Sequence, residues 1–242
     1  MKCEFEIDFT KEINAQSLKE QEYLDNLTYS KTPEVFLKVA RKDFKYMDLD
    51  IKPFLELYPP KNSSQQTRNE LLEIKSFMEQ DHSEEFSSNL KKMNDEPASF
   101  IIDYYEKRSG NKVPKEILNF ITGGDVEILA MKLKMHFNRP RPFQIAAYYD
   151  VKLDYNKTIQ HGAASAPSYP SGHTLSAYFA ARVLSYLYPV YENELQRRAM
   201  MVADSRVAEG VHFRSDNMFS FSLVDNLLMP AFVNAYDKTG DN

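Results

Sequence analysis

The chain has 242 residues, of which 43% are hydrophobic and 27% are charged, and its formal net charge is −5. This is the balance of an ordinary globular protein, and the length allows one substantial domain or at most two small ones. The negative net charge argues against a broad nucleic-acid-binding surface. Because Cys3 is the only cysteine, no disulfide can form within the chain.

The N-terminus and the apolar runs of the chain bear on where the protein resides. Residues 1–8 include acidic side chains where a signal peptide has its apolar core, so we expect no export signal. No uncharged apolar run reaches the roughly 18 residues that a membrane-spanning helix requires. The best candidates each contain a charged residue, which is Arg182 in 174–191 and Asp225 in 219–236. We therefore expect a soluble, cytoplasmic protein without a membrane span.

The first half of the chain is predicted to be helical, because its apolar residues recur with helical periodicity and the whole chain has only 7 glycines. Helix starts are marked by a proline or a serine, at Pro33, Ser64, Pro97 and Pro114. Residues 81–96 are polar, and we expect them to form a loop. Gly110 ends the helix that begins at Pro97. Gly123-Gly124 interrupts the following helix before it continues to about Asn138.

In the second half, Pro140 and Pro142 prevent that helix from continuing, because proline lacks an N–H and pushes the residue before it into an extended conformation. Residues 143–170 show little periodicity, and a loop of this length in a compact domain is usually functional or disordered. We expect a functional loop, because it connects two motifs. Further helices are expected at about 171–187, 193–209 and 214–236.

Together these elements predict an all-α protein, a single-domain helical bundle that occupies residues 1–242. Its motif-bearing core covers about 114–236. We expect the active site to form at helix ends and at the long loop, because the residues with chemical potential gather at those places.

The first motif is Pro170-Ser171-Gly172-His173, at the start of an expected helix. Ser171 is a good N-cap. The backbone N–H groups of Gly172 and His173 then lie at a helix N-terminus, where anions bind readily. Glycine allows an oxyanion to approach the backbone closely, and the Ser171 hydroxyl adds a donor. A capped helix with an incidental histidine is an equally good interpretation of this motif alone.

The second motif runs from Ser205 to Asp216. Arg206 falls near the end of an expected helix, and His212 and Asp216 are four residues apart, so their side chains can meet on a helical turn. A carboxylate on one ring nitrogen fixes the histidine tautomer and leaves the lone pair of the other nitrogen free to attack. The alternative is a surface His–Asp pair that caps a helix.

The third motif is Lys134-x6-Arg141-Pro142. Two prolines around Arg141 suggest a positioned guanidinium, although basic residues beside a helix end are common and are more often solvated. The sequence also offers a second register, Lys132-x6-Arg139-Pro140. We prefer the register of Lys134 because Phe143 follows Arg141-Pro142.

Taken together, the three motifs resemble the pattern of the type 2 phosphatidic-acid phosphatase superfamily, and every fixed position of that pattern is filled between residues 134 and 216. The flanking residues Ser168-Tyr169-Pro170 and Ser215-Asp216 are similar to those of the soluble bacterial class A nonspecific acid phosphatases. The chain has Pro167 where that class usually has glycine.

The resemblance implies a phosphate-ester hydrolase that requires no metal and no other cofactor, and whose anion site phosphate or vanadate can occupy. It implies that His212 attacks phosphorus to form a covalent phosphohistidine. Asp216 would hold and polarise His212, and His173 would protonate the leaving group and then activate water. The implied ligands of the nonbridging phosphate oxygens are Lys134, Arg141, Ser171, Gly172 and Arg206.

Two other functions share these motifs. A vanadate-dependent haloperoxidase has the same anion pocket, but the absence of tryptophan and the flanking residues favour a phosphatase. A non-catalytic anion-binding helical module is the second alternative, although no motif residue is replaced. The expected partner is a small-molecule phosphate ester, and no pattern indicates an oligomeric state. His82, His136 and His161 form no recognisable set of metal ligands.

Overall fold

The computed structural model describes residues 18–29, 31–154 and 164–240, and within them it contains helices and no β-strand. The all-α prediction is confirmed. The α-helices are α1 (Leu18–Asp25), α2 (Glu34–Ala40), α3 (Gln65–Met78), α4 (Glu84–Asp95), α5 (Pro97–Ser109), α6 (Lys115–Thr122), α7 (Asp125–Phe137), α8 (Pro142–Ile145), α9 (Gly172–Leu187), α10 (Glu192–Ala208), α11 (Arg214–Leu223) and α12 (Met229–Gly240). Short 3₁₀ turns are η1 (Lys52–Phe54), η2 (Ala146–Tyr149) and η4 (Pro189–Tyr191), and a π-helical turn, η5 (Val224–Leu228), joins α11 to α12.

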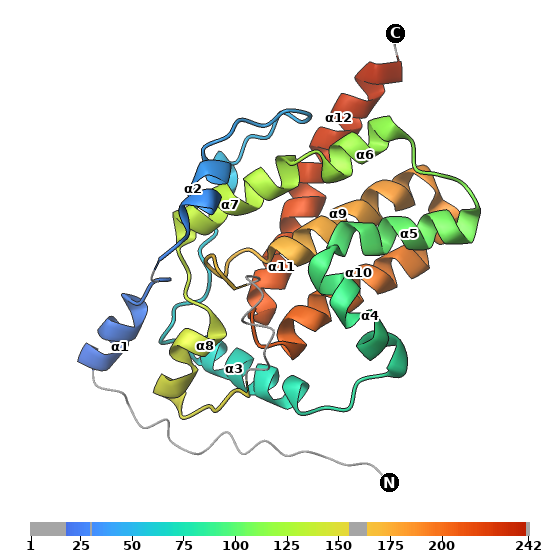
Figure 1. Ribbon diagram of the computed structural model, residues 1–242. Coiled ribbons are helices and arrows are strands. Elements are labelled where there is room, and N and C mark those ends of the chain that lie inside the picture. The colour runs from blue at the N-terminus through green and yellow to red at the C-terminus, as the bar shows by residue number, and fades with distance from the viewer. Residues whose placement is uncertain (1–17, 30, 155–163, 241–242) are drawn as a thin grey trace.

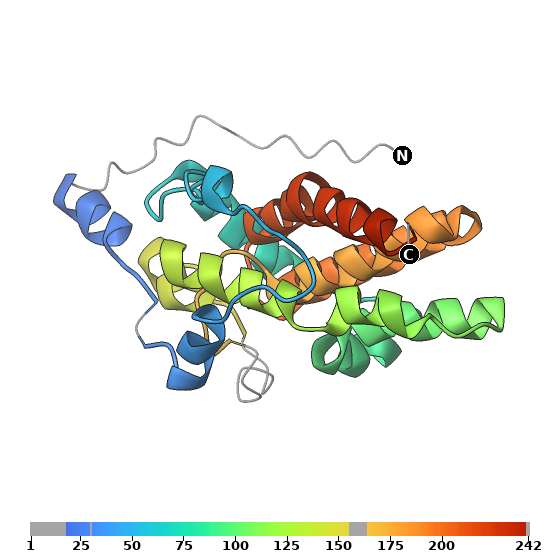
Figure 2. The same ribbon diagram turned by 90° about the horizontal axis from the view of Figure 1, so that it is seen from above.

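Helix α9 forms the centre of the bundle. It packs most extensively against α5 and α10, which lie beside it, and the run from α11 to α12 covers another of its sides (Figures 1 and 2). Leu175, Phe179 and Val183 of α9 are fully buried. A helix that is apolar around most of its circumference is stable in water only inside a core. The burial of α9 therefore sets the direction of its N-terminus, where the first motif lies.

The expected helix boundaries are largely confirmed. The side chains of Ser64 and Ser171 cap α3 and α9 by accepting the N–H groups of Thr67 and Thr174. Gly110 ends α5 in a left-handed conformation, with φ of 74°, which glycine adopts without strain. Within 143–170, the structure adds short helical turns, α8 and η2, and residues 151–154 have no regular secondary structure. Residues 155–163 of this expected loop lie outside the described residues.

The expected loop at 81–96 is wrong, because helix α4 occupies most of it. Ser83 caps the helix by accepting the N–H of Phe86. Phe86, Leu90 and Met93 recur at helical spacing and face the core beside α5 and α10. The mainly charged remainder of the segment conceals this narrow apolar stripe. The correction matters, because the end of α4 reaches the candidate site.

A buried carboxylate ties helix α7 to the preceding part of the chain. Asp125 at the start of α7 is fully buried and accepts the backbone N–H groups of Lys45, Tyr46 and Met47 at 2.7, 2.7 and 2.9 Å. A carboxylate with three backbone donors is well compensated for the loss of water. This contact holds the helix that carries Lys134 in place.

One continuous helical run, Arg214–Lys238, is long and apolar enough to cross a membrane, by length and composition only. The core helix of a soluble protein passes the same test. Leu223, Val224 and Phe232 of this run are buried within the bundle, so we interpret it as a core helix. A cytoplasmic location stays a prediction.

Candidate active site

The three motifs meet where helix ends converge. Lys134 lies in the last turn of α7, and Arg141 is the residue before α8. Ser171, Gly172 and His173 form the N-terminus of α9, and Arg206 lies in the last turn of α10. His212 and Asp216 flank the start of α11. His212 contacts Asp216 and Arg141, the backbone N–H of Ser171 donates to the carbonyl of Asp216, and Gly172 lies beside Lys134. His173 and Arg206 interact electrostatically with the same cations.

His212 is held between a carboxylate and a guanidinium. Its Nδ1 lies 3.0 Å from Oδ2 of Asp216, and its Nε2 lies 2.9 Å from Nη1 of Arg141. A guanidinium can only donate, so Nε2 must accept and the proton of the neutral ring is on Nδ1. The lone pair of Nε2 is therefore directed at the cations. Burial first, and Arg141 second, hold the pKa of His212 well below its usual value.

Asp216 receives several further hydrogen bonds besides that of His212. Arg139 Nη1 donates to its Oδ1 at 2.6 Å, and the backbone N–H of Phe213 and the hydroxyl of Ser168 donate to its Oδ2. Burial opposes ionisation of this carboxyl group, but Arg139 and then His212 more than offset it, so the pKa of Asp216 lies below its usual value. Asp216 is thus a fixed anion that orients His212.

The two arginines around Pro140 have different tasks. Arg139 pairs with Asp216, and its Nη2 lies 3.4 Å from Oε2 of Glu70. Arg141 faces His212 instead. Lys132, the partner of Arg139 in the second register, lies over the ring of Phe44. The arrangement thus places Lys134 and Arg141 at the site, whereas Arg139 supports the site from behind Asp216.

Lys134 and Arg141 are buried beside backbone carbonyl groups. Lys134 Nζ donates to the carbonyls of Pro167 and Ser168 at 2.5 and 3.1 Å. Arg141 donates from Nε to Ala166 at 2.9 Å and from Nη1 to Val211 at 2.7 Å. Burial, and then the neighbouring guanidinium, hold the pKa of Lys134 well below its usual value; burial lowers that of Arg141 to about 10. Neutral carbonyls do not cancel these charges, so the cluster favours an anion.

Arg206 is bound by the protein at one end of its guanidinium. The side chain is fully buried, and its Nη1 lies 2.9 Å from Oε2 of Glu209 and also donates to Oδ1 of Asn94. Among the described residues, Nε and Nη2 of Arg206 have no hydrogen-bond partner. Buried donors of this kind are rare and costly unless a ligand satisfies them.

Ser171 and Gly172 open α9 beside Lys134. The Ser171 hydroxyl donates to Oγ1 of Thr174 at 2.9 Å. A Cβ placed on Gly172 would meet Lys134 Cε at 4.0 Å, an ordinary contact. Packing within the described part of the chain therefore leaves room for a larger residue, so a requirement for glycine would have to come from a ligand that approaches the backbone.

His173 contacts the end of α4 and interacts electrostatically with the same cations. Its Nε2 is 2.8 Å from the backbone carbonyl of Asn94, which only accepts, so Nε2 carries a proton. Burial and then Arg206 hold the pKa of His173 well below its usual value, and Lys134 and Arg141 contribute further. Burial, Arg141 and Lys134 also lower the pKa of His212. Both imidazoles therefore face one cation cluster.

Five residues of this arrangement were not found as site residues from the sequence: Glu70, Asn94, Arg139, Ser168 and Glu209. Arg139 appeared only in the register that was not preferred. Ser168 carried a signal, because it belongs to the flank of the first motif that resembles the acid phosphatases. Glu70 and Asn94 are brought in by α3 and α4 and have no motif of their own. Glu209 lies inside the spacer between Arg206 and His212, where any residue fits the pattern.

The remaining described histidines lie outside the cation cluster. His136 Nε2 is 2.9 Å from the carbonyl of Leu55 in an exposed contact. His82 packs against the rings of Phe77 and Phe86. His161 lies outside the described residues. Within the described ranges, no group of three or more His, Cys, Asp and Glu residues is placed to hold a metal ion.

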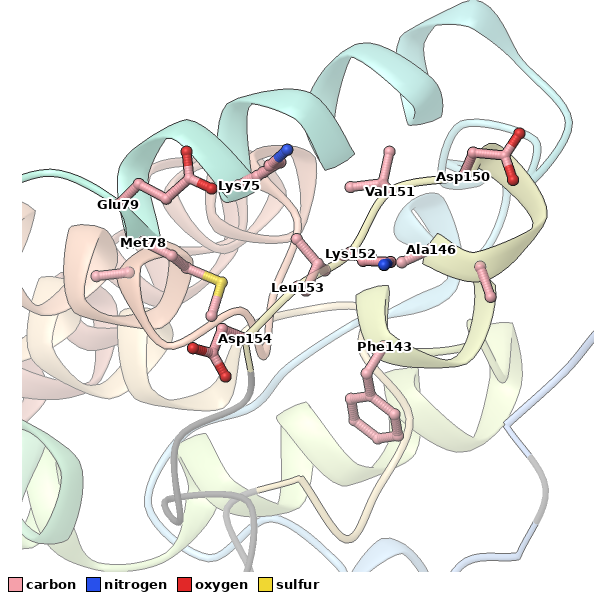
Figure 3. Close-up of a pocket in the computed structure, with 12 residues that line it drawn as sticks. Lys75, Met78, Glu79, Phe143, Ala146, Asp150, Val151, Lys152, Leu153 and Asp154 are labelled. Carbon is pink, nitrogen blue, oxygen red and sulfur yellow. The ribbon is translucent and has the colours of Figure 1, made fainter.

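A pocket of about 1100 Å³ lies between α3 and the segment that follows Arg141 (Figure 3). Its lining mixes apolar side chains such as Met78, Phe143 and Leu153 with both charge signs, among them Lys75 and Asp154. None of the eight predicted site residues lines it. We therefore do not assign this pocket to the phosphate group.

Part of the chain is similar to a known protein family and to several named enzymes. Residues 117–224 match the family model of the PAP2 superfamily. Non-specific acid phosphatases of Providencia stuartii and Salmonella typhimurium are 32% and 34% identical to this chain over 115 and 98 residues, which are 46% and 40% of this chain. A third, from Salmonella typhi, is 35% identical over 83 residues, or 34% of this chain.

These matches confirm the resemblance inferred from the motifs: residues 117–224 are similar to the PAP2 superfamily and to bacterial non-specific acid phosphatases. The alignments span 42%, 37% and 32% of the three relatives' own lengths.

Proposed function

We propose that the protein is a phosphomonoesterase that acts on small-molecule phosphate esters through a covalent phosphohistidine, without a metal cofactor. The observation that carries this proposal is the position of His212 between Asp216 and Arg141, at 3.0 and 2.9 Å. It gives a neutral imidazole with a fixed tautomer, whose Nε2 lone pair points at Arg141, one of the buried cations. Nucleophile, orienting carboxylate and anion site are thus in one place.

The phosphate group would bind between Lys134, Arg141 and Arg206. These cations and the N-terminus of α9 would contact the nonbridging oxygens, where charge must be compensated during phosphoryl transfer. Arg141 donates to Nε2 of His212. A phosphate dianion offers Arg141 stronger acceptors, so substrate binding would release the lone pair of the nucleophile.

In the first chemical step, Nε2 of His212 forms a bond to phosphorus while the bond from phosphorus to the leaving oxygen breaks. The leaving alkoxide takes a proton from His173. In the second step, His173 removes a proton from a water molecule, which attacks phosphorus as the P–N bond breaks. Phosphate leaves and His212 is restored, still oriented by Asp216.

The relatives favour this reaction over the alternatives. Those compared above are named as non-specific acid phosphatases, and no observation favours a haloperoxidase. The cations, rather than a metal, would stabilise the transition state, because guanidinium groups supply that charge in other phosphoryl-transfer enzymes.

Hydrolysis of p-nitrophenyl phosphate by the purified protein tests the proposal. The His212→Ala variant should retain its thermal midpoint and lose turnover by roughly 10⁴-fold or more, the scale seen when a catalytic nucleophile is removed. His136→Ala, a change of an exposed histidine, is the matched control and should be fully active. Full activity of His212→Ala would remove the nucleophile assignment.

The stereochemistry at phosphorus tests the covalent intermediate separately. Two in-line displacements return the original configuration, so a substrate with a chiral phosphorus should yield product with net retention. Net inversion would show direct attack by water and would contradict the phosphohistidine.

A further inference from the structure

Asn94 and Glu209 meet at the guanidinium of Arg206, although they come from different helices. Asn94 lies at the end of α4, and Glu209 directly follows α10. The amide of Asn94 donates to Oε1 of Glu209, and its Oδ1 accepts from Nη1 of Arg206. Oε2 of Glu209 lies 2.9 Å from the same Nη1. The three side chains therefore form a closed ring of polar contacts.

This ring determines which edge of Arg206 stays available. Nη1 donates to Oδ1 of Asn94 and forms an ion pair with Oε2 of Glu209, so both of these acceptors lie at the same nitrogen. The buried Nε and Nη2 have no partner among the described residues. These two nitrogens form the fork that binds two oxygens of a phosphate side by side. The ring thus turns the bidentate edge of the guanidinium away from the protein's own acceptors.

Asn94 also contacts the second histidine. Its backbone carbonyl accepts from Nε2 of His173 at 2.8 Å. The last carbonyls of a helix have no partner within the helix, and Pro97 prevents α4 from continuing. The end of α4 therefore supplies a free carbonyl to His173 and an amide side chain to Arg206.

We propose that Asn94 and Glu209 are positioning residues, which hold Arg206 so that its Nε and Nη2 grip the phosphate group of the substrate. This inference rests on the proposed function, because it takes the phosphate group of the substrate as the ligand of Nε and Nη2 of Arg206. Glu209 additionally provides a carboxylate that compensates the buried charge of Arg206.

Exchanging the two side-chain types tests the ring. Asn94→Asp places a second carboxylate against that of Glu209. The two carboxylates repel each other, and together they draw the guanidinium of Arg206 toward themselves. In Glu209→Gln, two amides cannot satisfy the ring, because one NH₂ group must face another donor. The double variant Asn94→Asp/Glu209→Gln closes the ring again with one bond reversed and with the original net charge. Asn89→Asp, on the same helix at a partly exposed position whose side chain donates to the backbone carbonyl of Glu85, is the matched control.

Three measurements are made on each variant: kcat/KM for p-nitrophenyl phosphate, the dissociation constant of inorganic phosphate by calorimetry, and the thermal midpoint. We expect kcat/KM to fall roughly 10- to 100-fold in each single variant, the scale of a misplaced ligand group. In Asn94→Asp the dissociation constant of phosphate should rise about 10-fold. In the double variant both quantities should return to within about threefold of the wild-type values. Asn89→Asp should be unchanged.

The proposal is overturned if the single variants keep wild-type kcat/KM and phosphate affinity, or if the double variant is as impaired as the worse single variant. Lower thermal midpoints with unchanged phosphate affinity would also overturn it, because they would show a merely structural pair. Phosphate binding by a wild-type protein that hydrolyses nothing would contradict the proposed function alone, and the calorimetric comparison would still decide the role of the ring.

Discussion

Arg139 donates from Nη1 to Oδ1 of Asp216 at 2.6 Å, and Asp216 orients His212 through its other oxygen. Glu70 lies behind Arg139 and accepts from the backbone N–H and the hydroxyl of Ser215. A buried chain of charged groups therefore runs from α3 to the candidate nucleophile. Each member is paired, which a buried charge requires.

We expect Arg139→Lys to lower kcat by roughly 10- to 100-fold, as when the support of a functional ligand is removed. A lysine cannot contact Asp216, Ser215 and Glu70 with one planar group. Because Arg139 faces Asp216 rather than the cation cluster, KM should change little. Steady-state kinetics with p-nitrophenyl phosphate measure both constants, and Arg41→Lys, which changes an exposed pair with Glu34, is the control. Wild-type kcat would contradict the support role.

The pH profile should reach its maximum on the acidic side. Burial and then Arg141 lower the pKa of His212, and burial and then Arg206 lower that of His173, both from a usual value of 6.5. The nucleophile must be neutral and the acid protonated, so kcat/KM falls below the lower pKa and above the higher one. Since both lie below 6.5, the maximum of kcat/KM should also lie below it.

The variant Arg206→Met tests whether Arg206 lowers the pKa of His173. Removing the cation should raise the pKa of His173 and move the pH profile toward higher pH, even though kcat/KM falls in magnitude. The second ionisation of the substrate, near pH 6, is the same for every variant. Arg197→Met, on the exposed side of α10, should leave the profile in place. A wild-type maximum above neutral pH would contradict the assigned directions.

Phosphate and vanadate should stabilise the protein and inhibit it competitively. Burial and then Arg141 disfavour the charged form of Lys134, and a bound oxyanion would offset both effects. At about 100 times the dissociation constant, a ligand of the native state adds roughly 2.7 kcal/mol of stability. Thermal unfolding with vanadate measures the shift, with chloride at equal ionic strength as the control. Equal shifts from both salts would indicate no specific anion site.

Asp125→Ala should destabilise the fold by roughly 3 kcal/mol or more, because the backbone N–H groups of Lys45, Tyr46 and Met47 lose a charged acceptor while buried or half-buried. Urea denaturation measures the loss. Asp103→Ala removes an exposed ion pair with Lys92, and should change the free energy of unfolding by less than about 1 kcal/mol. Similar values for both variants would show that Asp125 does not anchor α7.

The sequence was sufficient to predict those contacts whose two residues lie within a few positions of each other in the chain. Ser171 caps α9 through Thr174, three residues away, and His212 meets Asp216, four residues away. Such contacts follow from the geometry of one helical turn. The same holds for Gly110, whose conformation ends α5. Helix α4 was missed because its apolar stripe is narrow and most of its residues are polar.

The sequence by itself determined that the protein is all-α and that a histidine, a carboxylate and three cations occupy a recognisable pattern. Only the tertiary structure decided the partner of each cation. Arg139 meets Glu70 across 69 residues, and Arg206 meets Asn94 across 112. Chain spacing dictates neighbours only within a turn or two of helix. Distant partners depend on how buried faces pack, because a buried charge must find its counter-group wherever the fold provides one.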